Sequence, residues 1–126
     1  MAITFQTQKT TNAPLTYRDT ALQGTKSGVS SVPCELTGFN IINSDTADVY
    51  VKFYDASSGS TTVGTTVPIL TVYVPASSTI FQPHRWKDSI KYFATAMTIV
   101  SVTTLADSGT TNPGTATYIE VYYKST

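Results

Sequence analysis

Short stretches in which apolar and polar residues alternate recur along the chain after Pro33. The clearest is Val49–Tyr54, whose valines and Phe53 fall on one face of an extended chain while Tyr50, Lys52 and Tyr54 fall on the other. A period of two is typical of a β-strand that buries one face and exposes the other to water. The same pattern predicts strands at Ala2–Phe5, Glu35–Asn43, Val49–Tyr54, Ile69–Val74, Thr79–Gln82, Ile90–Thr95, Met97–Thr103 and Thr117–Lys124.

The residues between these stretches are typical of turns. Residues 43–46, 55–59 and 107–114 are rich in Asp, Asn, Ser, Thr and Gly. Pro68, Pro75 and Pro83 stand at strand ends, where a missing N–H costs least. No window has a helical period, apart from one possible short turn at Trp86–Ile90. We therefore predict an all-β fold, a single antiparallel β-sandwich of jelly-roll or Greek-key type. Its core should include Val51, Phe53, Leu70, Val72, Ile99, Ile119 and Val121.

The beginning of the chain follows a different pattern. From Gln6 to Ser31 the chain is polar, with few apolar residues, and it contains Pro14, Gly24 and Gly28. Such a segment buries too little apolar surface to offset the entropy of ordering it. We predict two parts, an N-terminal strand and extended polar arm at residues 1–31 and a β-sandwich domain at residues 32–126.

Composition and charge exclude several functions. The chain of 126 residues carries 8 Lys+Arg against 8 Asp+Glu, so it lacks the basic surplus that nucleic acids and anionic membranes attract. No stretch approaches the length of a membrane span, and the first residues do not resemble a secretory signal. We expect no nucleic-acid partner, no membrane partner, and synthesis in a cytosol.

Residues with catalytic or metal-binding chemistry are sparse. The only histidine, His84, and the only cysteine, Cys34, lie in no nucleophile motif, and together they cannot supply the four ligands of a zinc site. Asp45, Asp48 and Asp107 lack the spacing of a calcium loop and are typical of turn capping. Glu120 has the pattern of a solvated strand residue rather than of one of a catalytic carboxylate pair. The expectation is a protein that is not an enzyme, with no catalytic residues, no cofactor and no metal; Cys34 is expected to be a small apolar residue at a strand start.

Tyrosine is the residue type that stands out on the faces predicted to be wet. Tyr50, Tyr54, Tyr73, Tyr118 and Tyr122 all fall there. Tyrosine is enriched in interfaces because it combines a large apolar ring with a hydroxyl group. Cross-strand pairing of tyrosine with threonine on an exposed sheet explains the same pattern without any ligand, so both interpretations stay open.

Several segments resemble small proteins of tailed bacteriophages. They are Asp48–Asp55, Val63–Pro68, Leu70–Ala76, Tyr92–Ile99, Leu105–Asp107, Thr111–Pro113 and Val121–Lys124, so that the resemblance covers roughly residues 36–124. It implies a virion component, among which capsid decoration (cement) proteins are one type. The run His84–Lys87 departs from the pattern, in which small or glycine-rich residues are expected, and this indicates a partner contact specific to this chain.

The resemblance implies a capsid decoration protein that binds the major capsid protein and copies of itself as a homo-oligomer, located in the virion after synthesis in the host cytoplasm. A neck, tail or fibre component of the virion is the first alternative. The second is a carbohydrate-binding module, in which Trp86 and nearby tyrosines would form an aromatic platform for a glycan. The candidate interface residues are Ile3, Phe5, Leu15, Tyr17, Tyr50, Tyr54, Tyr73, Trp86, Tyr118 and Tyr122.

Overall fold

A computed structural model describes residues 14–126, and nearly all of the regular secondary structure in this part of the chain is β-strand. One short 3-10 helix, η1 (Ser58–Ser60), interrupts them. The strands are β1 (Leu15–Leu22), β2 (Ser27–Ser30), β3 (Cys34–Asn43), β4 (Val49–Tyr54), β5 (Leu70–Val74), β6 (Ser78–Gln82), β7 (Lys91–Phe93), β8 (Met97–Val102) and β9 (Thr117–Ser125).

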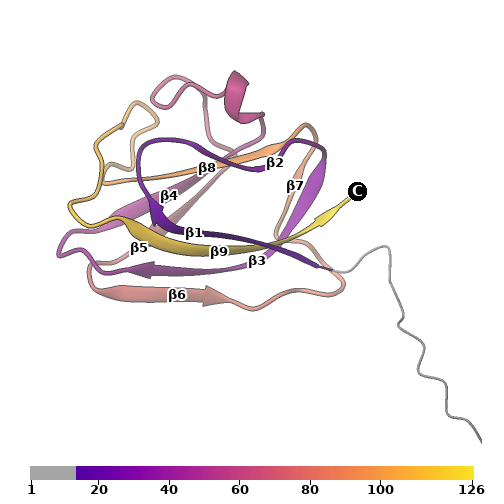
Figure 1. Ribbon diagram of the computed structural model, residues 1–126, viewed down its shortest axis with the longest axis horizontal. Helices are drawn as coiled ribbons and strands as arrows, with labels where there is room; N and C mark the ends of the chain where they lie inside the picture. The colour runs from indigo at the N-terminus through magenta and orange to yellow at the C-terminus, as the bar shows by residue number, and fades with distance from the viewer. Residues whose placement is uncertain (1–13) are drawn as a thin grey trace, which may run out of the picture.

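The strands form two antiparallel sheets that pack face to face (Figure 1). The first sheet has the order β1-β9-β3-β6, with β7 also paired to β3, and the second has the order β2-β8-β4-β5. The chain crosses between the sheets at nearly every connection, staying in one sheet only from β4 to β5 and from β6 to β7. If β6 and β7 are counted as two halves of one strand, eight strands remain, and this connectivity is that of a jelly roll.

The core lies between the sheets and is made of the alternate residues that the sequence pattern indicates. Val51, Phe53, Ile99, Ile119 and Val121 are all fully buried, as predicted. Phe53 lies at the centre, with its ring 6.3 Å from that of Phe39 and 6.4 Å from that of Phe93. Leu70 and Val72 are only half-buried, because they lie on the edge strand β5.

The outer face of the second sheet is not exposed to water as the alternation predicts. Two long connections, residues 55–69 and 103–116, lie over it on the side away from the first sheet (Figure 1). Lys52 and Tyr54 are therefore fully buried, and Tyr54 packs with Val100 and Val102 in a small second core. Hydrogen bonds hold the covering loops in place: the Lys52 ammonium donates to the carbonyl of Ala106, and the Thr98 hydroxyl donates to another loop carbonyl, that of Ala56.

The prediction of a polar arm is wrong for the described residues 14–31. Residues 15–22 form β1 at the edge of the first sheet, and residues 27–30 form β2 at the edge of the second. Edge strands need few apolar residues, since much of their surface stays in water; here Leu22 and Val29 are buried in the core and Tyr17 packs against it. The predicted boundary at residue 31 accordingly falls inside the sandwich. The predicted strand Ala2–Phe5 lies outside the described residues.

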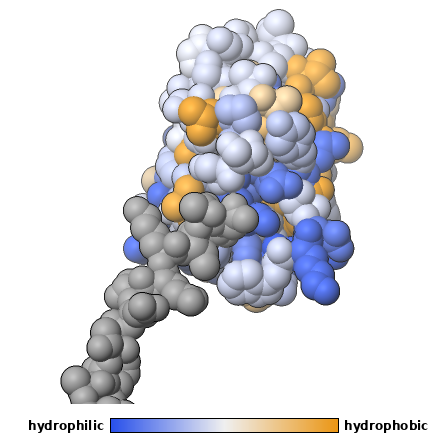
Figure 2. Space-filling view, turned by 90° about the vertical axis from the view of Figure 1, so that its right-hand side faces the viewer, coloured by the Kyte–Doolittle hydropathy of each residue, from blue (hydrophilic) through white to orange (hydrophobic). Residues whose placement is uncertain are grey.

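The other predicted elements agree with the structure within a few residues. Val49–Tyr54 is reproduced at both ends, while Ile90–Thr95 shortens to β7. Trp86–Ile90 forms no helical turn, and Cys34 is a buried free cysteine at the first position of β3. On the side of the molecule drawn in Figure 2, hydrophobic residues form separate small patches among polar ones rather than one continuous surface.

Candidate functional site

The outer face of the first sheet carries the candidate site. The strand register places Thr16 of β1 beside Tyr122 of β9, and Tyr122 beside Gly38 of β3. Two residues further along β3, Asn40 pairs with Phe81 of β6. Thr16, Asn40, Phe81 and Tyr122 alternate with residues that face the other sheet, so their side chains point away from the sandwich.

The segment between β6 and β7 folds over this face because β3 anchors it at two points. The N–H of Arg85 donates to the carbonyl of Thr37 at 2.9 Å, and the N–H of Ile90 donates to the carbonyl of Leu36 at 2.7 Å. Gly38 makes the close approach possible, because a Cβ there would lie 2.6 Å from the carbonyl oxygen of Gln82. The register of β3 against β9 also shifts between Leu36 and Gly38, a bulge of the kind that re-aims side chains.

His84 and Trp86 take defined positions in this segment. The His84 Nδ1 lies 2.7 Å from the hydroxyl oxygen of Thr37, which fixes the imidazole against β3. The indole of Trp86 meets the imidazole at an angle of 84°, with ring centroids 4.6 Å apart. Trp86 is 75% exposed, the highest value among the large hydrophobic residues described. The exposed indole of Trp86 is thus held against the imidazole of His84, which is itself held by Thr37 of β3.

Together these side chains line an apolar groove with a volume of about 330 Å³. Its lining is Pro14, Thr16, Phe81, His84, Trp86 and Tyr122, contributed by the start of β1, by β6, by β9 and by the segment between β6 and β7. We call it the aromatic groove. Its volume lies at the lower end of the range for small-molecule sites, about 300–1,000 Å³.

The polar atoms of the groove are neutral. Burial lowers the pKa of His84, and the nearby Lys124 lowers it further, so the imidazole is uncharged at neutral pH. Its Nε2 is buried and has no hydrogen-bond partner among the described residues. Burial also raises the pKa of Tyr122, with a smaller contribution from the charge of Glu120, and the phenol stays protonated. The groove therefore offers hydrogen-bonding groups without net charge.

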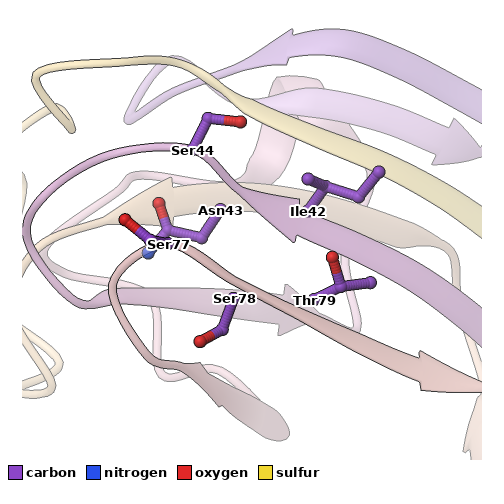
Figure 3. Close-up of a pocket in the computed structure, with 6 residues that line it drawn as sticks. All are labelled: Ile42, Asn43, Ser44, Ser77, Ser78 and Thr79. Carbon is purple, nitrogen blue, oxygen red and sulfur yellow. The ribbon is translucent and has the colours of Figure 1, made fainter.

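Two further hollows have polar linings. The first has a volume of about 250 Å³ and lies between two segments, the end of β3 with the turn that follows it and the start of β6. Figure 3 shows the six residues that line it, Ile42, Asn43, Ser44, Ser77, Ser78 and Thr79. Its polar groups bond within the fold: the amide of Asn43 donates to backbone carbonyls of Ala47, Val74 and Pro75. The second, about 320 Å³, is lined by Gly28, Val29, Ser30, Ser31, Ser57 and Ser58. Neither hollow gathers aromatic rings, so the aromatic groove is the stronger candidate.

The structure separates the predicted interface residues into groups. Trp86 and Tyr122 meet in the aromatic groove, while Tyr50 and Tyr73 pair on the other sheet with ring centroids 5.4 Å apart. The Tyr73 hydroxyl donates to a carboxylate oxygen of Asp48 at 2.9 Å. These two tyrosines thus pair with each other across the strands, rather than with threonine.

Tyr118 is likewise engaged within the chain. The guanidinium carbon of Arg18 lies 5.4 Å from its ring centroid, and the Tyr118 hydroxyl donates to Glu120 at 2.9 Å. Tyr54 is fully buried, so its assignment to an interface is wrong: the loops over the second sheet cover it.

The remaining predicted residues lie on or before β1. Leu15 is 44% exposed and Tyr17 is half-buried against the core, both on this edge strand. Ile3 and Phe5 lie outside the described residues.

Sequence reasoning missed most of the groove. The outward position of Phe81 could have been predicted from the alternation, because Ile80 faces the core and the next residue of a strand points to the opposite side. His84 was considered as a catalytic or metal-binding residue and as part of the run His84–Lys87 that indicates a partner contact, but it was not named among the interface residues; Thr16 was assigned to the arm. No local pattern places these residues together, since they come from β1, β6 and the segment that follows β6.

Several chemical features are absent from the described residues 14–126. No group of three or more His, Cys, Asp or Glu side chains is arranged to hold a metal ion. Within the same residues, no helix is long and apolar enough to cross a membrane. Comparisons of the chain with protein-family models, curated proteins and solved structures found no match.

Proposed function

We propose that this chain is a structural virion protein, a capsid decoration protein that binds the head of a tailed bacteriophage and associates with copies of itself. The observation that carries the proposal is the free edge of β1. With eight residues, β1 is the longest edge strand of the two sheets, and within residues 14–126 it pairs only with β9. Such an edge is a template for pairing with another chain.

The first half of β1 is the part suited to association. From Leu15 to Asp19 the register against β9 is regular, and it shifts between Asp19 and Leu22. A bulge twists an edge away from further pairing, so a partner strand would bind along the first half. Leu15, 44% exposed, supplies an apolar contact there.

The fold and the phage resemblance support the same proposal. Jelly rolls form viral capsid domains, although they also form lectin domains and cupins, and a fold alone does not define a function. The resembling residues 48–76 form β4, the loop that covers the second sheet, and β5. Weak contacts, repeated over many copies on a closed shell, add up to stable binding.

The experiment measures decoration of phage heads that lack this protein. We expect the full chain to bind them and Leu15→Lys to bind at least tenfold less, because the charge disrupts pairing at the edge. Leu105→Lys is the matched control, since Leu105 is 60% exposed in the loop before β9 and should tolerate the change. Thermal melts establish that both variants fold. Equal decoration by Leu15→Lys and the full chain would contradict the role of β1.

The position of the protein in the virion needs a separate measurement. Immunogold labelling of intact virions should place gold on the head if the chain is a decoration protein. Label confined to the neck, tail or fibres would replace the head assignment with one of those parts. Deletion of residues 1–13 tests the contribution of Ile3 and Phe5 to binding and keeps β1 and β2. A longer deletion, of residues 1–31, would also remove both of these strands from the sandwich, so it would not test the N-terminal residues separately.

A further inference from the structure

We propose that the aromatic groove is a binding site for a neutral saccharide, a pyranose of the glucose type. The site lies on the face of the sheet rather than along its free edge, although Thr16 belongs both to the groove and to the first half of β1, and the inference does not rest on the virion proposal. It joins three observations on the first sheet: an exposed tryptophan held in place, two further aromatic rings beside it, and polar groups without charge.

The apolar part of the groove matches one face of a sugar ring. A pyranose with equatorial hydroxyl groups presents its axial C–H groups as flat apolar patches, which pack on aromatic rings. Trp86, Tyr122 and Phe81 supply such rings, and Phe81 is 60% exposed. Because the imidazole of His84 holds the indole edge-on, Trp86 needs little reordering when a ligand binds.

The polar part of the groove matches the hydroxyl groups at the rim of a sugar ring. Thr16 and Tyr122, two residues of the lining, carry hydroxyl groups. The volume of about 330 Å³ accommodates one or two sugar rings.

The charge of the site selects against other ligands that stack on aromatic rings. Nucleic-acid bases stack equally well, but their phosphates require Lys or Arg in the groove. The lining itself holds neither; Lys124, whose charge acts on His84, and Arg85 and Lys87, which flank Trp86 in the chain, lie outside it. A sialic acid or uronic acid would likewise leave its carboxylate without a cation in the lining. A neutral hexose fits this chemistry best.

Trp86 is the only tryptophan of the chain, so its fluorescence reports directly on the groove. The full-length protein is titrated with cellotetraose, a neutral chain of β-linked glucose, and with maltotetraose, its α-linked counterpart. We expect a saturable change in intensity and a blue shift with one of the two. Free sialic acid, which has no neutral hexose ring, should leave the spectrum unchanged at the same concentrations. A spectrum that neither neutral sugar alters would overturn the proposal.

Variants assign the effect to the groove, with binding followed by saturation-transfer NMR, which does not need the tryptophan. Trp86→Ala should weaken binding at least tenfold, and Tyr122→Ala should weaken it to a similar extent. Tyr92→Ala is the matched control, since Tyr92 is an exposed aromatic residue, 54% exposed, outside the lining. Unchanged binding by Trp86→Ala would contradict the assignment. If no sugar binds and Trp86→Ala instead loses decoration of phage heads, the groove is a protein contact and the saccharide proposal fails, while the virion proposal stands.

Discussion

The carboxylate of Asp45 accepts a hydrogen bond of 2.8 Å from the backbone N–H of Gly114, which lies 69 residues further along the chain. Its other oxygen accepts one of 2.7 Å from the N–H of Thr46. Asp45 is only 7% exposed, and it joins the turn after β3 to the loop before β9. One side chain thereby ties together two of the connections at this end of the sandwich.

The first prediction concerns Asp45. Burial raises its pKa, but hydrogen bonds from backbone N–H groups outweigh burial and bring the pKa below its ordinary value; the donors are Gly114, Thr46, Thr115 and Ala47. A depressed pKa means that the carboxylate stabilises the fold above its ordinary pKa of about 3.9, and that this is lost as pH falls through the lower folded value. Asp45→Asn should therefore lower the urea midpoint at pH 7, and the gap to wild type should narrow below about pH 4.

The control for this change is Asp88→Asn, at an exposed position between β6 and β7. It should leave the urea midpoint unchanged across the same pH range. A gap between wild type and Asp45→Asn that stays constant down to pH 2 would show that the ionised carboxylate is not the stabilising group.

The second prediction concerns the buried charge of Lys52. Its pKa is lowered by burial, an effect that the charge of Asp107 opposes, and its ammonium donates to the carbonyl of Ala106. Replacing a buried charge by an apolar side chain of similar volume is often neutral or stabilising. Lys52→Met should match or exceed wild type in thermal stability. Lys52→Ala leaves a cavity and should be less stable than Lys52→Met by about 2–5 kcal/mol. A large destabilisation by Lys52→Met would show that the ammonium is essential to the loop above it.

The third prediction compares two core residues that the sequence pattern treats alike. Phe53 is fully buried between Phe39 and Phe93, whereas Leu70 is half-buried on an edge strand. Phe53→Ala should lower the free energy of unfolding by about 3–5 kcal/mol, and Leu70→Ala by less than about 2 kcal/mol. Urea denaturation measures both. The exposed Leu105→Ala is the control and should stay within about 0.5 kcal/mol of wild type.

The fourth prediction concerns the turn between β5 and β6. Ser77 has a φ of 52°, and within the described residues it is the one non-glycine residue with positive φ. The left-handed region costs an ordinary residue about 1–2 kcal/mol, which glycine avoids at the expense of some chain entropy. Ser77→Gly should therefore stabilise the protein by about 0.5–1 kcal/mol. Ser78→Gly, one position later in β6, should destabilise it by a similar amount, about 0.5–1 kcal/mol. A loss of stability in Ser77→Gly would contradict the argument.

The sequence pattern predicts strands well where one face enters the core. Val49–Tyr54 and its neighbours carry alternating apolar residues because each lies within a sheet that buries one side. β1 and β2 were not predicted because these edge strands expose most of their surface. Leu22 and Val29 are their only buried apolar residues, which is too few to give an alternating pattern. Lys52 and Tyr54 were assigned to the wrong side for a related reason. Alternation reports which face meets the other sheet, and it contains no information about loops that return from residues 55–69 and 103–116 to cover the opposite face.

The aromatic groove could not be predicted from the alternation pattern either. Trp86 and Tyr122 were recognised as candidates by residue type alone, from the enrichment of aromatic residues at binding surfaces. Their meeting with Phe81 depends on the bulge near Thr37 and on the absence of a side chain at Gly38, which let a distant segment lie across β3. Such approaches between distant segments have no counterpart in local periodicity.

The arrangement of β6 and β7 along β3 has a consequence for how such a protein changes over time. Each half-strand has its own register with β3, β6 with residues 39–43 and β7 with residues 34–36. The residues between them are held through backbone groups of Thr37 and Leu36, which any amino acid provides. The segment that presents Trp86 can therefore vary in sequence while the two sheets keep their pairing. The part of the groove that carries His84 and Trp86 is therefore free to diverge without remaking the sandwich, whereas Thr16, Phe81 and Tyr122 lie on the strands themselves.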